Sequence, residues 1–348
     1  MTLEKIDICS YDLDELTAFL ESLSQPKYRA KQIFKWLQSG IEDFDQMTNI
    51  PLALRNILKE KCYLATVKIV RRLASQIDET VKYVYELYDG EYIESVLMKY
   101  EHGYTVCIST QVGCRMGCSF CASGIDGLFR NLTPSEMIAQ ITKAQHDNNI
   151  RISNVVMMGM GEPLDNTDQV LKALRLITDT KLLAWSPRRI TLSTVGVKGN
   201  LKRFLDESEC HLAISLHAPT PQLRSELMPA ERIYSITDIV EVLKGYDFTG
   251  QRRLSFEYIL FDGVNDTMAD ARKLVRLLDG LQCRINLIRF HAIPDSELDG
   301  VPMERMVVFR DYLTRHGLFT TIRASRGEDI YAACGMLSTK ELKKQQNQ

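Results

Sequence analysis

The sequence of 348 residues predicts an α/β fold, in which a partial (β/α)6 barrel follows a small N-terminal helical module and a β-hairpin connection. Between residues 104 and 337, short apolar runs rich in strand-forming residues alternate with amphipathic helical stretches. Repeated βα units imply parallel strands joined by right-handed crossovers. Residues 1–65 show only helical periodicity, and residues 66–103 alternate as antiparallel strands do. Six strands are too few to close the barrel, so one side should stay open to a large substrate.

Two amphipathic helices make up the predicted N-terminal module. The first runs from Leu13 to Leu23, and the second runs from Arg29 to Leu37. Basic side chains crowd the second helix, namely Lys27, Arg29, Lys31 and Lys35. Such a cluster is either a solvated helix face or a surface that contacts phosphate groups, and the sequence leaves both interpretations open.

The connection to the barrel is predicted to be a hairpin. Alternating apolar residues run from Lys82 to Tyr88 and again from Tyr92 to Met98. The residues between them include Asp89-Gly90, a typical tight-turn pair. The second strand of the hairpin should lead directly into the first strand of the barrel.

The barrel elements follow from local patterns. Strands are expected at Val106–Thr110, Asn154–Met158, Arg189–Ser193, Leu212–Leu216, Leu254–Leu260 and Arg284–Phe290. Helices are expected at Thr167–Ile177, Ser235–Leu243, Thr267–Leu278 and Met303–His316. The clearest helix begins at Thr133-Pro134-Ser135-Glu136, where Thr133 can cap the helix, Pro134 suits the first turn and Glu136 completes a capping box.

Composition indicates a globular protein of a reducing compartment. The chain is 45% hydrophobic and 25% charged, and its net charge of -2 neither requires nor excludes a nucleic-acid partner. Its nine cysteines are unevenly spaced, which argues against a disulfide scaffold. We find no secretory pattern and no apolar run that could span a membrane, so we expect a cytoplasmic protein without a membrane partner. Residues 338–348 form a polar tail.

Three cysteines lie close together after the first barrel strand: Cys114, Cys118 and Cys121. Reactive groups in parallel barrels lie at the C-terminal ends of the strands, so this position favours a functional site. Three thiolates can hold an iron–sulfur cluster by three of its four irons, which leaves one iron open for chemistry. A structural zinc site is the alternative, although a second paired motif that would supply its fourth ligand is missing.

The spacing C-x3-C-x2-C resembles the radical-SAM signature, and further motifs make the chain similar to the RlmN/Cfr family of RNA adenine methyltransferases. Those motifs are Cys107-Ile-Ser-Thr-Gln-Val-Gly-Cys114, Arg130-Asn131-Leu132, Gly161-Glu162-Pro163, Leu192-Ser193-Thr194, Ser215-Leu216-His217 and Asp329-Ile-Tyr-Ala-Ala-Cys334-Gly335. The match runs from the helical module to near the C-terminus. It implies a radical-SAM barrel and a methyltransferase that uses S-adenosylmethionine.

The resemblance implies one [4Fe-4S] cluster. Cys114, Cys118 and Cys121 would ligate it, and its open iron would bind the amino and carboxylate groups of S-adenosylmethionine. Residues at later strand ends would contact that cofactor, namely Gly161, Glu162, Ser193, Ser215, Leu216, His217 and His291. At His291 the family commonly has Asn, and a histidine offers a hydrogen bond that depends on its protonation.

The resemblance also implies a reaction through two further cysteines. Cys334 would accept a methyl group from one S-adenosylmethionine, and a second molecule would supply the radical that activates this methyl group. After the resulting methylene radical had added to the adenine, Cys107 would release the product by forming a transient disulfide with Cys334. Glu94 would accept the proton that the ring loses. An electron donor of the flavodoxin or ferredoxin type and a thiol reductant would be partners.

The implied substrates are C2 of one adenosine in 23S rRNA and the adenosine that follows the tRNA anticodon. A C8-methylating branch linked to antibiotic resistance is the nearest alternative, but Gln111–Cys114 and Arg326–Asp329 look more like the C2 branch. An RNA-binding protein with structural zinc and no catalysis is an alternative of another class. We expect a monomer that meets RNA with the helical module and the open side of the barrel.

Overall fold

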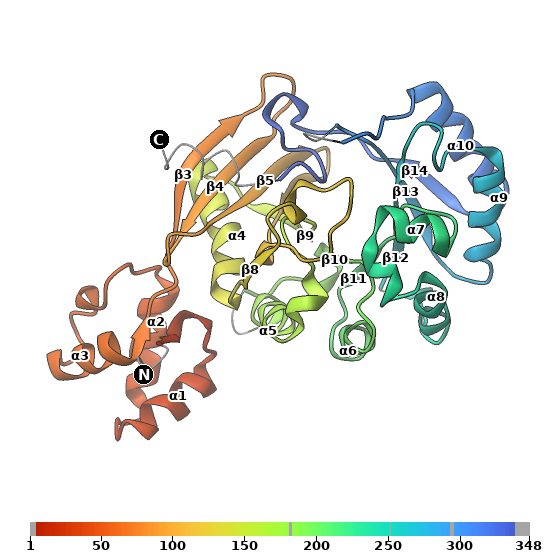
Figure 1. Cartoon of the computed structure of the whole chain (residues 1–348). Helices are drawn as coiled ribbons and strands as arrows, with labels where there is room; N and C mark the ends of the chain where they lie inside the picture. Colours follow the sequence, from red (N-terminus) through yellow and green to blue (C-terminus); the bar gives the residue numbers. More distant parts are fainter. Residues whose placement is uncertain (1–4, 181–182, 251, 293–295, 338–348) are drawn as a thin grey trace.

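A single sheet of ten strands runs through the computed structural model, which describes residues 5–180, 183–250, 252–292 and 296–337. The strand order is β14-β13-β12-β11-β10-β9-β6-β5-β4-β3. One part of the sheet forms the barrel, and the other continues as an extension beside the N-terminal helices (Figure 1). The predicted polar tail at 338–348 lies outside the described residues.

The barrel part of the sheet is parallel. Its strands are β6 (Gly103–Cys107), β9 (Ile152–Met157), β10 (Ile190–Thr194), β11 (His211–Ser215), β12 (Leu254–Leu260), β13 (Arg284–Arg289) and β14 (Phe319–Ile322). Within the described residues β14 pairs only with β13, so the barrel is open and the predicted partial barrel is confirmed. The sequence does not predict β14. This strand is short, and its pattern is the reverse of the usual one, because the apolar Phe319 is exposed while the polar Thr320 is buried.

Helices cover the outer side of the curved sheet (Figure 1). They are α4 (Pro134–Asn148), α5 (Thr167–Thr178), α6 (Asn200–Glu207), α8 (Ile236–Lys244), α9 (Met268–Leu277) and α10 (Met303–Arg315). Helix α7 (Pro221–Leu227) lies instead at the strand ends, where the Ser119 N–H of the cysteine loop donates to the Leu227 carbonyl oxygen. Helix α4 begins with the predicted capping box of Thr133 and Glu136. The sequence does not predict α6 and α7, which are too short for a clear helical period. No helix in the described part of the chain is long and apolar enough to cross a membrane.

The N-terminal module has a core of its own. Its helices are α1 (Leu13–Ser22), α2 (Tyr28–Gln38) and α3 (Leu52–Lys61), and its short strands β1 (Ile6–Asp7) and β2 (Cys62–Tyr63) pair in parallel. Leu16, Leu20 and Ile33 are fully buried between these elements. The module is fixed to α4, because the Asp7 carboxylate accepts a hydrogen bond from Ser135 Oγ at 2.6 Å.

The predicted hairpin is part of a longer antiparallel extension. Its strands are β3 (Val67–Ala74), β4 (Val81–Leu87) and β5 (Tyr92–Tyr100), and β3 is an addition to the two predicted strands. Gly90 in the β4–β5 turn has φ +83°, a conformation that glycine adopts at little cost. Because β5 pairs with β6, the extension and the barrel share one hydrogen-bonded sheet.

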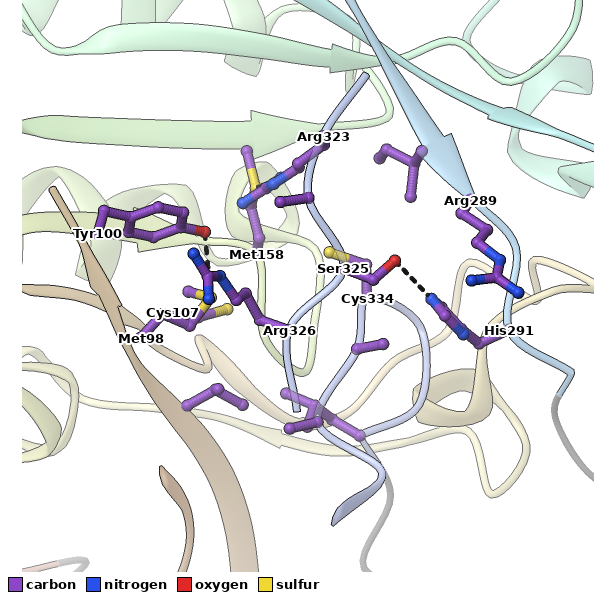
Figure 2. Close-up of a pocket in the computed structure, with 16 residues that line it drawn as sticks. Met98, Tyr100, Cys107, Met158, Arg289, His291, Arg323, Ser325, Arg326 and Cys334 are labelled. Carbon is purple, nitrogen blue, oxygen red and sulfur yellow. Dashed lines mark hydrogen bonds between the residues drawn. The ribbon is translucent and has the colours of Figure 1, made fainter. Parts of the chain in front are cut away.

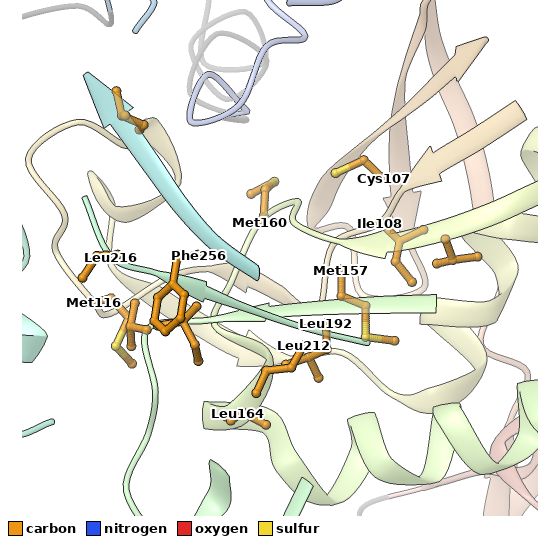
Figure 3. Close-up of a cluster of buried hydrophobic side chains, with 14 of the residues drawn as sticks. Cys107, Ile108, Met116, Met157, Met160, Leu164, Leu192, Leu212, Leu216 and Phe256 are labelled. Carbon is orange, nitrogen blue, oxygen red and sulfur yellow. The ribbon is translucent and has the colours of Figure 1, made fainter. Parts of the chain in front are cut away.

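Apolar side chains from neighbouring strands fill the barrel core. Figure 3 shows Met157, Leu192 and Leu212, which come from β9, β10 and β11, together with Leu164 and Phe256. All five are at most 1% exposed. A buried leucine of this kind stabilises the fold by about 2–5 kcal/mol. This packing fixes the strands, and their C-terminal ends therefore form a rigid rim.

One buried ion pair closes the rim near β10 and β11. The Arg224 guanidinium is fully buried and forms an ion pair with Glu231. Its Nη2 donates to the Val195 and Ser215 carbonyl oxygens, each at 2.9 Å, and the Glu231 carboxylate accepts from the Ile236 N–H at 3.0 Å. A single guanidinium thus joins two strand ends to the beginning of α8.

We expect Arg224→Met to lower the free energy of unfolding by about 3–5 kcal/mol, because it leaves a buried carboxylate without its counter-charge. Urea unfolding followed by circular dichroism measures this loss. The double variant with Glu231→Gln should recover part of it, since no unpaired charge then remains. Equal stability of Arg224→Met and the unchanged protein would contradict the role given to the pair.

Candidate active site

A pocket opens at the C-terminal ends of the barrel strands. Its space free of protein atoms, including the part that is open to solvent, is about 780 Å³. We call it the strand-end pocket. Its lining contains most of the predicted site residues: Cys114, Cys118, Cys121, Gly161, Glu162, Ser193, Ser215, His217 and Cys334. Residues separated by more than two hundred positions in the sequence therefore meet in one cavity.

The cysteine motif lies on the loop between two short paired strands, β7 (Gln111–Gly113) and β8 (Leu128–Asn131). The Cys114 N–H donates to the Gly127 carbonyl oxygen at 2.9 Å, and the Cys121 N–H donates to the Cys118 carbonyl oxygen at 3.1 Å. The loop therefore turns back on itself, which brings all three thiols to the strand-end pocket.

The three thiols fit the implied [4Fe-4S] cluster better than a zinc ion. Burial raises the pKa of Cys114 to about 12, and it also raises the pKa values of Cys118 and Cys121. Such thiols ionise only if a metal centre replaces their protons. A cluster binds each of the three sulfurs through a different iron and needs no fourth protein ligand, whereas a structural zinc ion does.

The Glu162 carboxylate is held by the backbone around it. Its Oε1 accepts hydrogen bonds from the Leu164 N–H at 2.9 Å and from Thr194 Oγ1 at 2.5 Å, and its Oε2 accepts from the Val195 N–H at 2.9 Å. Burial raises the pKa of Glu162 to about 7, although these hydrogen bonds oppose the shift. The side chain joins the turn after β9 to the end of β10 at the wall of the pocket.

Gly161, Ser193 and Ser215 line the pocket from three neighbouring strands. Gly161 has φ +100°, and a Cβ at this position would lie 2.6 Å from the Cβ of Gln111. Only glycine fits here, because Gln111 packs directly against the backbone of the turn. The two serines lie within the last two residues of β10 and β11, as the strand pattern predicts.

His217 reaches the pocket, whereas the neighbouring Leu216 does not. Nδ1 of His217 accepts the Ile259 N–H at 3.1 Å, and burial lowers the pKa of His217 to about 3. The imidazole is therefore neutral at physiological pH, with Nε2 as its donor. The Phe120 ring meets it edge-on, with centroids 4.8 Å apart. The Leu216 side chain is fully buried in the barrel core and is not part of the pocket lining.

A second pocket, which we call the Cys107 pocket, adjoins the first and holds about 560 Å³ of space free of protein atoms. Cys107 and Cys334 both line it, and both are free thiols (Figure 2). Burial and, to a smaller degree, the nearby Cys334 raise the pKa of Cys107 to about 12. Cys334 also lines the strand-end pocket, so this one thiol belongs to both cavities.

His291 lies in the Cys107 pocket and is not among the residues that line the strand-end pocket. Its Nε2 is 2.9 Å from Ser325 Oγ, a hydrogen bond drawn in Figure 2. Burial lowers the pKa of His291, which the Glu328 carboxylate partly offsets. The structure therefore separates His291 from the other predicted cofactor contacts.

Glu94 is buried on β5, with 3% of its surface exposed. Its Oε2 lies 2.9 Å from Lys82 Nζ. Glu94 lines neither pocket, but Val96 and Met98 lie on the same face of β5 and both line the Cys107 pocket. The Glu94 side chain therefore extends from the face of β5 that borders the Cys107 pocket, although it does not line that pocket.

The motifs also did not indicate Arg323 and Glu257, two charged residues that line the pockets. Arg323 follows β14 and lines both pockets. Glu257 lies on β12 and lines the strand-end pocket, and its Oε2 is 3.6 Å from Arg323 Nη1. Burial alone would lower the pKa of Arg323, but the Cys334 thiol group and Glu257 raise it, so the guanidinium is a permanent cation. The strand position of Glu257 was the only sequence signal for either residue.

Family comparisons cover both the module and the barrel. Residues 6–64 match the model described as the ribosomal RNA large subunit methyltransferase N-terminal domain, and residues 108–276 match that of the Radical SAM superfamily.

Similar proteins cover almost the whole chain. The probable dual-specificity RNA methyltransferase RlmN of Bacteroides fragilis is 53% identical over 336 residues, which are 96% of this chain and 97% of that protein. The protein of the same name from Bacteroides thetaiotaomicron is 52% identical over 97% of both chains. The crystal structure of a radical SAM methyltransferase from Sphaerobacter thermophilus is 40% identical and covers 95% of this chain and 99% of that one, with a TM-score of 0.86.

The raised pKa of Glu162 predicts a pH dependence of stability. The pKa rises from 4.5 to about 7 on folding, so the folded state holds the proton more tightly. This stabilisation is complete below pH 4.5 and is lost as the pH rises through about 7. We expect Glu162→Gln to remove a pH-dependent contribution of roughly 3 kcal/mol. Urea unfolding of the cofactor-free protein between pH 4.5 and 8 tests it, and parallel stability curves for the two proteins would refute it.

Proposed function

The chain belongs to the RlmN family of radical-SAM RNA methyltransferases, and from that premise we propose that it methylates C2 of one adenosine in 23S rRNA and of the adenosine that follows the tRNA anticodon. The observation that carries this proposal is the position of Cys334, which lines both the strand-end pocket and the Cys107 pocket. A thiol in this place can carry a one-carbon unit from one cavity to the other. The names of the full-length relatives, which call them dual-specificity RNA methyltransferases, support two RNA substrates.

The strand-end pocket is the proposed cofactor site. Cys114, Cys118 and Cys121 hold the [4Fe-4S] cluster. Gly161, Glu162, Ser193, Ser215 and His217 contact S-adenosylmethionine, while Leu216 supports this wall from the core and His291 acts only from the Cys107 pocket. When bound, the cluster and two molecules of S-adenosylmethionine per turnover supply an electron, a methyl group and a hydrogen-abstracting radical.

The protein's own residues then release the product. Cys334 carries the methyl-derived carbon, which is joined to C2 of the adenine. The Cys107 thiolate attacks the sulfur of Cys334, so that an S–S bond forms while the bond from sulfur to carbon breaks. The electron pair of that bond stays on the carbon, which takes up a proton and becomes the methyl group. Glu94 accepts the proton lost from C2, and the unpaired electron that radical addition leaves on the ring would return to the cluster that supplied it. An external thiol reduces the disulfide.

The remaining partners follow from this chemistry. We assign the enzyme to the cytoplasm, where RNA and reducing thiols are available, and we expect it to act as a monomer. A flavodoxin or ferredoxin type of protein supplies the electron. The helical module is the proposed RNA contact, because its match to a ribosomal RNA methyltransferase domain agrees with the basic residues Lys27, Arg29, Lys31 and Lys35 on and beside α2.

Mapping of the methylated product tests the regiochemistry. We expect 2-methyladenosine when the reconstituted enzyme is incubated anaerobically with 23S rRNA fragments or tRNA, and nucleoside mass spectrometry against both isomers identifies it. The C8-methylating alternative is weakened by the high identity to proteins named RlmN. Detection of 8-methyladenosine without the 2-methyl isomer would overturn the proposal.

Substitution of each reactive cysteine should stop the reaction at a different point. Cys334→Ala removes the thiol that carries the methyl group, so we expect no RNA methylation and no adduct. Cys107→Ala leaves that thiol but removes the group that releases it, so a covalent protein–RNA complex should accumulate. Denaturing gels with labelled RNA distinguish the two variants. Normal turnover by Cys107→Ala would show that it does not resolve the adduct.

A further inference from the structure

We infer that Lys82 is a positioning residue, which holds the Glu94 carboxylate and the loop that carries Cys334 in one fixed arrangement. This inference deepens the proposed function and rests on the roles given there to Glu94 and Cys334. Neither the sequence motifs nor the comparisons assign a role to Lys82. It lies on β4, in the extension and outside the barrel.

Lys82 joins three segments of the chain at one buried point. Its side chain is 7% exposed, and its Nζ lies 2.9 Å from Glu94 Oε2 on β5. The same Nζ donates to the Tyr331 carbonyl oxygen at 3.1 Å, a contact that spans 249 residues. A buried ammonium is stable only when such groups surround it, so its two partners are held at fixed positions relative to each other.

Further hydrogen bonds attach the same loop to the β3–β4 turn. The Asp329 carboxylate accepts from Ser75 Oγ and from the Gln76 N–H, each at 2.7 Å. The Gly327 N–H donates to Asp78 Oδ2 at 3.1 Å. The loop before Cys334 is therefore fixed to the extension by side chains of the loop and of the β3–β4 turn.

The chain after Cys334 is attached to the cysteine loop of the barrel. The Gly335 carbonyl oxygen accepts from the Ala122 N–H at 2.7 Å, and the Leu337 carbonyl oxygen accepts from Ser123 Oγ at 2.8 Å. Cys334 thus lies on a short segment between two attachments, one to the extension and one beside the predicted cluster ligands. Lys82 contributes to the attachment to the extension, and its ammonium group also contacts Glu94.

This geometry separates early steps of the reaction from the later ones. Methyl loading of Cys334 and cleavage of S-adenosylmethionine need the strand-end pocket, and there the bonds of Ala122 to Gly335 and of Ser123 to Leu337 hold the Cys334 segment without Lys82. Transfer of the carbon to RNA and release of the product need Cys334, Cys107 and Glu94 at fixed positions relative to one another. Loss of Lys82 should therefore leave the early steps intact and impair the later ones, since a misplacement of about 1 Å can cost about a hundredfold in rate.

Lys82→Met tests the inference, and Lys99→Met is its matched control. Lys99 on β5 also forms an ion pair, 2.7 Å from Glu79, but this pair is solvent-exposed and does not touch the Cys334 loop. We expect Lys82→Met to lower the yield of methyladenosine per 5′-deoxyadenosine by about 10- to 100-fold, with Cys334 still methylated in intact-mass spectra. Lys82→Arg should restore part of the yield, and Lys99→Met should match the unchanged protein.

Hydrogen exchange separates this inference from the proposed function. In the protein without RNA, amides of residues 327–335 should exchange faster in Lys82→Met than in Lys99→Met. Lys82→Gln, which keeps a polar side chain at the buried point, takes the place of Lys82→Met if the latter does not fold. Unchanged exchange, or an unchanged yield ratio, overturns the inference. Faster exchange in a protein that never methylates adenosine would instead support the attachment and refute the proposed function.

Discussion

The arrangement of the whole molecule depends on the two-sided pairing of strand β6. It pairs antiparallel with β5 on one side and parallel with β9 on the other. Both edges of its backbone are therefore satisfied, and neither neighbour can shift without breaking a ladder of hydrogen bonds. Cys107 ends this strand, so its thiol lies where the antiparallel extension becomes a barrel. Glu94 on one side and the strand-end pocket on the other are positioned by the same junction.

Buried charges connect the strand ends into one frame. Arg224 joins the ends of β10 and β11, Glu162 joins the β9 turn to β10, and Lys82 joins the extension to the loop of Cys334. Buried ions are costly to desolvate and contribute little net stability, but they are satisfied by only one arrangement of their partners. In this protein they therefore act chiefly by fixing positions around the two pockets, while the apolar barrel core provides most of the stability.

Sequence patterns predicted those parts of the fold whose signal is local. The bounds of β12 agree with the apolar run Leu254–Leu260, and the cysteine motif indicated the pocket that three thiols line. Strand β14 was missed because it is a strand through its pairing with β13, and its own residues show no strand pattern. Arg323 and Lys82 were missed for a similar reason: their partners Glu257 and Tyr331 lie far away in the sequence. Contacts of this kind are fixed by tertiary packing, which single-sequence patterns do not contain.

The extension that receives the Cys334 loop leaves β3 as an edge strand of the sheet. Within the described residues no strand covers its outer side, so its free backbone groups could pair with a second chain. The strand opposes this with a bulge between Ile69 and Arg71 and with the exposed charges of Lys68, Arg71 and Arg72. The open sheet that supports the site therefore has an edge strand whose bulge and charges hinder aggregation.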